Sequence, residues 1–206
     1  LAIAAVSKRE DPRDVLVTVD GRKLRDLPDG AVIGTSSVRR EVQISCIRPG
    51  MVYKILRGNV LTRLKKLKDG EYDAIVLAAA GLKRLGLEDC CVEYFNTDDV
   101  IPAVGQGILA IEARKGDVLD YLTDSVHDPD SFYAALAERA FMIRLNGGCT
   151  VPMGAHAVIE GDIMKIKGML ALEDRSKVLR AEVEGSKYDA ENLGRMLAEM
   201  ILKQLR

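Results

Sequence analysis

The chain has 206 residues, of which 48% are hydrophobic and 30% are charged, and its formal net charge at pH 7 is -1. This composition predicts a soluble globular protein with one large core or two small ones, and no apolar run approaches the ~20 residues of a membrane-spanning helix. Four cysteines and two histidines show neither Cys-x-x-Cys nor His-x-x-x-His spacing, so no metal site is expected, and low cysteine density fits a reducing cytoplasm.

Charge is unevenly distributed along the chain. Residues 34–87 contain eleven Lys and Arg against four Asp and Glu, whereas residues 88–132 contain two against eleven. The basic stretch is a candidate anion-binding surface, and the acidic stretch is most simply a solvated face. Because only 4% of the residues are aromatic and none is Trp, the basic stretch lacks the stacking platforms of a nucleic-acid site. A small polyanion fits it better.

The chain begins with an apolar run, Leu1 to Val6, that predicts a strand. The run lacks the basic region and the cleavage pattern of a signal peptide. Because the chain starts inside this strand and has no initiator methionine, we expect it to be a fragment or a processed product of a longer protein.

Strands and helices then alternate through the first half of the chain. Three strand-like runs, each followed by a helical pattern, occupy residues 31–33 and 36–47, 51–56 and 59–67, and 73–78 and 81–85. This alternation predicts an α/β fold with a parallel or mixed sheet covered on both faces. Ligands of such sheets bind at the carboxyl ends of the strands.

A different pattern begins at residue 128. A long amphipathic helix is followed by three β-rich runs and a final helix, at residues 131–145, 155–159, 164–172, 177–183 and 190–205. This order predicts a separate α+β domain, with a boundary near residue 127.

The first candidate site is the turn Gly34-Thr35-Ser36-Ser37-Val38-Arg39-Arg40. It follows a predicted strand and opens a helix, with Ser36 as the expected N-cap. Arg39 and Arg40 in the first helical turn oppose the helix dipole, so they favour an anion bound between them and the backbone N–H groups. A solvated surface is the alternative for these two arginines.

Similar residues follow the next two strands. Arg57 and Arg63 flank Asn59, the expected N-cap of the second helix, and Arg63 is placed to point back towards the same edge of the sheet as Arg57. Lys83 and Arg84 follow the third strand and add to the same edge of the sheet. The segment Ala103-Val104-Gly105-Gln106-Gly107 is a two-glycine turn, which serves either as a tight connection or as a close approach to a ligand.

Cys149 follows Gly147 and Gly148, which leave its sulfur room to be approached. A buried structural thiol is the simplest reading of a single free cysteine. A reactive thiol needs help, because the unperturbed pKa is near 8.5 and a position after a helix C-terminus does not lower it. Activation has to come from nearby cations or from an electrophilic substrate.

These motifs together resemble the porphobilinogen deaminase family, also called hydroxymethylbilane synthase. The resemblance is carried, in order and across nearly the whole chain, by residues 8–14, 34–40, 56–64, 73–87, 102–112 and 138–154. It implies a transferase that joins four porphobilinogen molecules head to tail on a covalent dipyrromethane cofactor. Ammonia is released at each addition, and hydroxymethylbilane is the product.

The resemblance also implies roles for individual residues. Cys149 matches the cysteine that carries dipyrromethane through a thioether. The positions that hold the cofactor are Thr35, Ser37, Arg39 and Arg40. The positions that contact substrate or the growing chain are Arg57, Arg63, Arg84, Gln106 and Gly107. Each pyrrole carries carboxylates, which arginine binds well.

The family fold implies three domains. Residues 16–98 match a lobe with a mixed sheet that resembles periplasmic binding proteins. Residues 1–15 and 101–127 match the remnant of a first, similar lobe. Residues 128–206 match a C-terminal α+β domain with a three-stranded antiparallel sheet, which carries the cysteine.

The family's catalytic aspartate lies in an N-terminal segment that these 206 residues do not include. We therefore expect the isolated chain to be inactive or nearly so and to be prone to self-association, although the family is monomeric. Neither nucleic acid nor membrane is an expected partner. The alternative function, from a different class, is a non-catalytic binding module for a small polycarboxylate.

Overall fold

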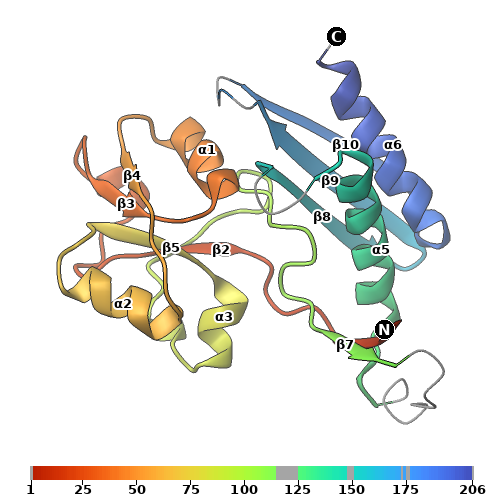
Figure 1. The fold of residues 1–206 in the computed structure, drawn as a ribbon, viewed down its shortest axis with the longest axis horizontal. Helices are drawn as coiled ribbons and strands as arrows, with labels where there is room; N and C mark the ends of the chain where they lie inside the picture. The colour runs from red at the N-terminus through yellow and green to blue at the C-terminus, as the bar shows by residue number, and fades with distance from the viewer. Residues whose placement is uncertain (1, 115–124, 148–150, 173, 175–176, 206) are drawn as a thin grey trace.

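The protein is described by a computed structural model, which covers residues 2–114, 125–147, 151–172, 174 and 177–205. Two groups of elements lie side by side (Figure 1). The α/β lobe consists of β2 to β6 with α1 to α3, and the C-terminal unit consists of β8 to β10 with α5 and α6. Strand β7 lies near the N-terminus, beneath the C-terminal unit in this view.

The α/β lobe is built on a five-stranded mixed sheet with the strand order β4-β3-β5-β2-β6. Its strands are β2 (Asp14–Val17), β3 (Val32–Gly34), β4 (Val52–Lys54), β5 (Ala74–Ala78) and β6 (Glu93–Tyr94). Strand β3 is parallel to β4 and β5, whereas β2 is antiparallel to β5 and β6. The predicted mixed sheet is confirmed.

Helices cover both faces of this sheet. The helices of the lobe are α1 (Val38–Ile47), α2 (Val60–Lys68) and α3 (Ala79–Arg84). Since side chains alternate along a strand, Leu16 and Val76 pack with Ile44 of α1, and their neighbours pack on the opposite side with residues of α2 and α3. Burial on both faces explains the continuous apolar runs of β2 and β5.

The C-terminal unit is an antiparallel sheet packed against two helices. Its elements are β8 (Met153–Glu160), β9 (Ile163–Ala171), β10 (Val178–Ser186), α5 (Pro129–Arg144) and α6 (Ala190–Lys203). Strand β9 pairs with both others. Phe141 and Leu197, from the two helices, are fully buried against Met164 and Ile166 of β9. The predicted three-stranded sheet and its two helices are confirmed.

A third, smaller sheet joins segments that are far apart in the sequence. Strand β1 (Ala2–Val6) pairs antiparallel with β7 (Ala110–Ala113), with Ala2 opposite Ala113 and Val6 opposite Ala110. The remaining short elements are the 3-10 helices η1 (Leu24–Asp26), η2 (Glu88–Cys90) and η3 (Lys187–Asp189). Among the described residues, no helix has the length and apolar character needed to span a membrane.

The outer face of α1 forms the contact between the lobe and the C-terminal unit. Val42 packs with Met169 and Ala171 of β9. Ile101 completes this cluster and comes from residues 95–109, which connect β6 to β7 and are called the linking segment. Arg180 of β10 donates hydrogen bonds to backbone carbonyls of residues 98 and 99. Helix α1 therefore contacts the sheet of its own lobe, the linking segment and the C-terminal unit.

Candidate active site

The turn between β3 and α1 is held by its own side chains. The N-cap of α1 is Ser37, whose hydroxyl accepts a hydrogen bond from the Arg40 amide at 3.4 Å. The predicted N-cap, Ser36, is wrong by one residue, because its hydroxyl donates instead to the Leu56 carbonyl at 2.6 Å. The Thr35 hydroxyl accepts from the Ser37 amide at 3.1 Å. These bonds place the start of α1 at the carboxyl edge of the sheet.

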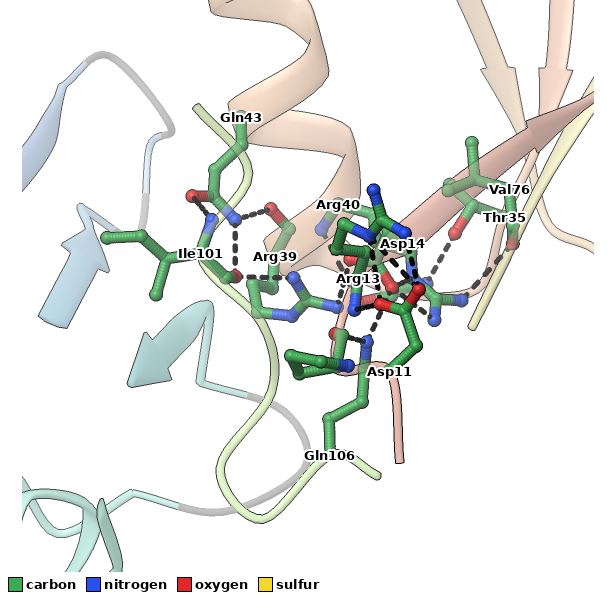
Figure 2. A network of polar contacts seen from close by, with 12 residues as sticks. Asp11, Arg13, Asp14, Thr35, Arg39, Arg40, Gln43, Val76, Ile101 and Gln106 are labelled. Carbon is green, nitrogen blue, oxygen red and sulfur yellow. Dashed lines mark hydrogen bonds and ion pairs between the residues drawn. The ribbon is translucent and has the colours of Figure 1, made fainter. Parts of the chain in front are cut away.

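Arg39, in the first turn of α1, has a buried guanidinium with two anchors (Figure 2). Its Nη2 donates to Asp14 Oδ2 at 2.7 Å, and its Nη1 donates to the Ile101 carbonyl at 2.6 Å. Gln43, one turn later, donates to the same carbonyl at 3.1 Å and accepts from the Ile101 amide at 2.8 Å. Arg39 and Gln43 therefore bind the backbone of the linking segment to α1.

Arg40 binds the same carboxylate from another direction. Its Nε and Nη2 donate to Asp14 Oδ1 at 3.0 and 2.8 Å, and its Nη1 donates to the Val76 carbonyl at 3.2 Å. Gln106 Nε2 also donates to Asp14 Oδ1, at 2.9 Å, and to the Pro12 carbonyl at 2.6 Å. We call Asp14, Arg39, Arg40 and Gln106 the Asp14 cluster. The structure thus brings together three residues that the sequence predicted as site residues.

The electrostatics of the Asp14 cluster favour its charged form. Burial by itself raises the pKa of the Asp14 carboxyl, but the charges of Arg40 and Arg39 and the hydrogen bonds from Arg40 and Gln106 outweigh it and hold the pKa below its ordinary value. Burial, with the nearby charge of Arg40, lowers the pKa of Arg39, and Asp14 opposes this shift. An arginine keeps its proton in proteins, so the cluster is an ion pair with one additional cation.

Arg63 adds a further positive charge to this region. Partial burial and the charge of Arg40 lower its pKa. Its Nε donates to the Gly58 carbonyl at 2.8 Å. Asp14 compensates one of the three guanidinium charges of Arg39, Arg40 and Arg63. The excess positive charge matches a ligand with more than one carboxylate.

A cleft of about 360 Å³ connects the start of α1 with the residues around Cys149. Ser37 and Arg39 line one side of it, and Gly147 and Val151 line another. Cys149 itself lies outside the described residues, but Gly147 and Val151 are two residues away from it on either side. The cleft therefore places the flanks of this cysteine against the predicted cofactor-holding turn.

The remaining predicted residues are not among those that line this cleft. Arg57 and Arg84 are exposed, after β4 and at the end of α3, respectively. Lys83 pairs with Glu10 at 2.7 Å. Gly107 has a positive φ of 87°, and a Cβ there would lie 2.4 Å from the Glu10 carbonyl oxygen. A glycine is thus required at position 107 by a close backbone contact.

A larger cleft, of about 430 Å³, lies on the outer face of β8 to β10. Its lining includes His156, Lys165 and Lys167. Burial and the charges of Arg9 and Lys167 lower the pKa of His156 to about 4, so this imidazole is neutral at pH 7. Within the described part of the chain, no group of three or more His, Cys, Asp or Glu is placed to hold a metal ion.

Sequence reasoning missed Asp14 and Gln43. Asp14 directly precedes the apolar run Val15-Leu16-Val17, and a carboxylate beside a buried strand is a signal that a cationic partner is required. Gln43 lies one helical turn after Arg39, so its position on the same face of α1 was available from the helix periodicity. Its contact with the backbone of Ile101 could not be predicted from the helix periodicity, because Ile101 lies 58 residues away in the sequence.

Comparison with known proteins identifies relatives along nearly the whole chain. The family model described as "Porphobilinogen deaminase, dipyromethane cofactor binding domain" matches residues 1–119, and "Porphobilinogen deaminase, C-terminal domain" matches residues 132–203. Porphobilinogen deaminase of Thermus thermophilus is 49% identical over 206 residues, which cover 99% of this chain and 68% of the relative. That of Roseiflexus castenholzii is 50% identical over 204 residues, covering 98% and 67%.

The matched residues include the whole α/β lobe and nearly all of the C-terminal unit, and with them both sides of the cleft. The excess of arginine charge beside the cleft suits a dipyrromethane cofactor, whose pyrroles carry carboxylates. The chain belongs to the porphobilinogen deaminase family of transferases in tetrapyrrole biosynthesis.

Proposed function

We propose that this protein joins four porphobilinogen molecules into hydroxymethylbilane, with release of ammonia, on a dipyrromethane bound through a thioether to Cys149. The observation that carries the proposal is the cleft in which Gly147 and Val151, the flanks of Cys149, face Ser37 and Arg39. A group attached to a sulfur between these flanks has a short path to the excess positive charge of the arginines.

Four residues of the β3–α1 turn are proposed to hold the cofactor, namely Thr35, Ser37, Arg39 and Arg40. When bound, dipyrromethane supplies the primer to which pyrrole units are added. Arg40 donates hydrogen bonds from Nε and Nη2 to Asp14, and its positive charge lies beside the cleft. Ser37 lines the cleft at the N-terminus of α1, where backbone N–H groups favour an anionic group.

The substrate and the growing chain are proposed to contact Arg57, Arg63, Arg84 and the turn containing Gln106 and Gly107. Arg57 and Arg63 flank the start of α2, and the charge of Arg40 acts on Arg63. Carboxylates added at each step therefore meet further cations beyond the cofactor position. The hydrogen bonds of Gln106 to Asp14 and Pro12 support a role for this turn in shaping the site.

We also propose the division of the chain that the family fold implies. Pairing of β1 with β7 supports the assignment of residues 1–15 and 101–127 to one lobe. The five-stranded sheet, whose strand β2 begins at Asp14, supports a second lobe of the periplasmic-binding-protein type, with proposed bounds at residues 16–98. Residues 128–206 are proposed as the third domain. Cys46, Cys90 and Cys91 are free thiols, which supports a cytoplasmic setting.

A separate proposal concerns the 206-residue polypeptide by itself. The chain spans about two thirds of the length of its relatives, and the resemblance implies that the family's catalytic aspartate lies outside the matched residues. We propose that this polypeptide, purified alone, does not turn over porphobilinogen. A measurable steady-state rate of ammonia release would contradict this.

Intact mass spectrometry of the full-length protein tests the proposed cofactor attachment. We expect one covalent adduct that reacts with an aldehyde reagent for pyrroles and is absent from Cys149→Ser. Cys46→Ser is the matched control, because Cys46 is an exposed free thiol on α1, and this variant should keep the adduct. An unmodified Cys149 in a protein that binds porphobilinogen without turnover would favour the polycarboxylate-binding module instead.

A further inference from the structure

The carboxylate of Asp14 is the centre of the Asp14 cluster, and it comes from outside the turn that it binds. It receives four N–H donors from three side chains: Arg39, Arg40 and Gln106. The Asp14 side chain is fully buried, and those of Arg39 and Arg40 are 5% and 11% exposed. Three side chains, two adjacent in α1 and one from the turn at Gln106, therefore have their orientation set by one buried group.

Backbone carbonyls, as well as Asp14, hold the two arginines. Arg39 is also bound to the Ile101 carbonyl, so both of its terminal nitrogens have protein partners. Arg40 uses Nε and Nη2 on Asp14 in a side-on arrangement, and its Nη1 donates to the Val76 carbonyl at 3.2 Å. These bonds fix the plane of its guanidinium and leave the second N–H of each terminal nitrogen for a ligand. A planar fork that is fixed in this way loses little freedom when it binds a second carboxylate.

Two roles for Asp14 make opposite predictions. If Asp14 is only a counter-ion, it competes with the carboxylates of a ligand, and removing its charge strengthens ligand binding. If Asp14 orients the arginines, removing or displacing its carboxylate weakens ligand binding even though the net positive charge increases. Full burial and four donors describe a fixed anchor.

We propose that Asp14 is a positioning residue that orients Arg39 and Arg40 towards the carboxylates of the cofactor. It neutralises one guanidinium charge and leaves the other for the ligand. The identity of the ligand as a dicarboxylate pyrrole rests on the proposed function, whereas the anchoring geometry does not. Asp14 acts through the arginines and is not a catalytic residue.

Two substitutions separate geometry from charge. Asp14→Asn keeps the shape but removes the charge, and it places an amide opposite Arg39 Nη2 or the Arg40 fork. Asp14→Glu keeps the charge but moves the carboxylate by one methylene within a fully buried site. Asp11→Asn is the matched control on the same segment, because Asp11 is bound to Arg13.

The test measures two properties of the full-length protein in its folded, monomeric fraction. The first is the fraction of molecules that carry the adduct, by intact mass, and the second is KM for porphobilinogen. We expect both Asp14 variants to carry the adduct in at most about a third of molecules and the loaded molecules to show a KM raised about ten-fold, as for the loss of one charge-assisted hydrogen bond. Asp11→Asn should match the wild type in both.

Each outcome has a definite meaning. Full loading of both Asp14 variants, or a lower KM for Asp14→Asn with a wild-type KM for Asp14→Glu, would identify a counter-ion and overturn the proposal. Failure of both variants to fold would show a role in the fold alone and would also overturn it. A wild-type protein without an adduct would instead count against the proposed function, so the two failures are distinguishable.

Discussion

The α/β lobe contains two strand-to-helix turns with the same local pattern and different surroundings. In the β3–α1 turn, Ser37 caps the helix and Arg39 is buried against Asp14. In the β4–α2 turn, Asn59 caps the helix at 2.9 Å, and Arg63 donates to a backbone carbonyl within its own turn. The two turns therefore differ in one partner, the carboxylate of Asp14. It fixes Arg39 and Arg40 in the first turn, whereas Arg57 and Arg63 of the second turn remain more accessible.

The largest expected difference between the two turns is in stability. Arg39→Gln removes one partner of a buried ion pair and leaves the Ile101 carbonyl without its charged donor, so we expect a loss of about 3 kcal/mol in the free energy of unfolding. Arg63→Gln should cost less than about 1 kcal/mol, because Arg63 is only partly buried. Urea unfolding of both full-length variants measures these changes in the free energy of unfolding. Equal losses for the two variants would contradict the claim that only Arg39 is held in a buried ion pair.

The pH dependence of stability sharpens the same comparison. Because the pKa of Asp14 is lowered in the folded protein, its contribution is present above the unfolded-state pKa and is lost as pH falls through the folded-state pKa. The difference in unfolding free energy between wild type and Asp14→Asn should therefore be largest near neutral pH and shrink in acid. For Asp69→Asn, in the exposed Lys65–Asp69 pair of α2, the difference should stay small throughout. A gap for Asp14→Asn that does not change with pH would contradict the buried ion pair.

The accessible arginines should affect substrate binding more than stability. We expect Arg57→Gln and Arg63→Gln in the full-length protein each to raise KM for porphobilinogen about ten-fold, since each removes a charge-assisted bond to a carboxylate. Thermal midpoints should change little. Lys65→Gln is the control, because the Lys65 side chain is 74% exposed on α2. An unchanged KM for both arginine variants would place substrate elsewhere.

The two helix caps should give the smallest effects. Ser37→Ala and Asn59→Ala each remove a side-chain acceptor at an N-cap, which costs about 1 kcal/mol of stability. Only Ser37→Ala should also lower the fraction of molecules with an adduct on Cys149, because Ser37 lines the cleft. Chemical denaturation and intact mass of the two variants provide the comparison, and equal loading would argue against contact between Ser37 and the cofactor.

Local features of the sequence predicted much of the fold. The apolar run of β5 and the Asn59 N-cap of α2 are as expected, because both depend on residues close in sequence. The predicted helix near 81–85 begins earlier, at Ala79, since no polar cap marks its start. The choice of Ser36 over Ser37 failed because two adjacent serines are equally good caps, and only the contact with Leu56 distinguishes them.

The candidate site was predictable only in part. Arg39 and Arg40 were identified from their position at a helix start, and a bound anion was expected to compensate them. Asp14 supplies part of that compensation, and it is 25 residues from Arg39 in the sequence. Likewise, no local pattern indicates that Gln106 reaches Asp14 across 92 residues. Pairings of this kind arise from tertiary packing, so a single sequence shows the charges without showing their partners.

A crystal structure of the full-length protein tests the central claim most directly, because it shows which cleft holds the group on Cys149. We predict continuous density from Cys149 Sγ into the cleft lined by Ser37 and Arg39, with at least one carboxylate within about 3 Å of the Arg40 guanidinium. Density that leads instead into the larger cleft beside His156, with no carboxylate near Arg40, would contradict the account.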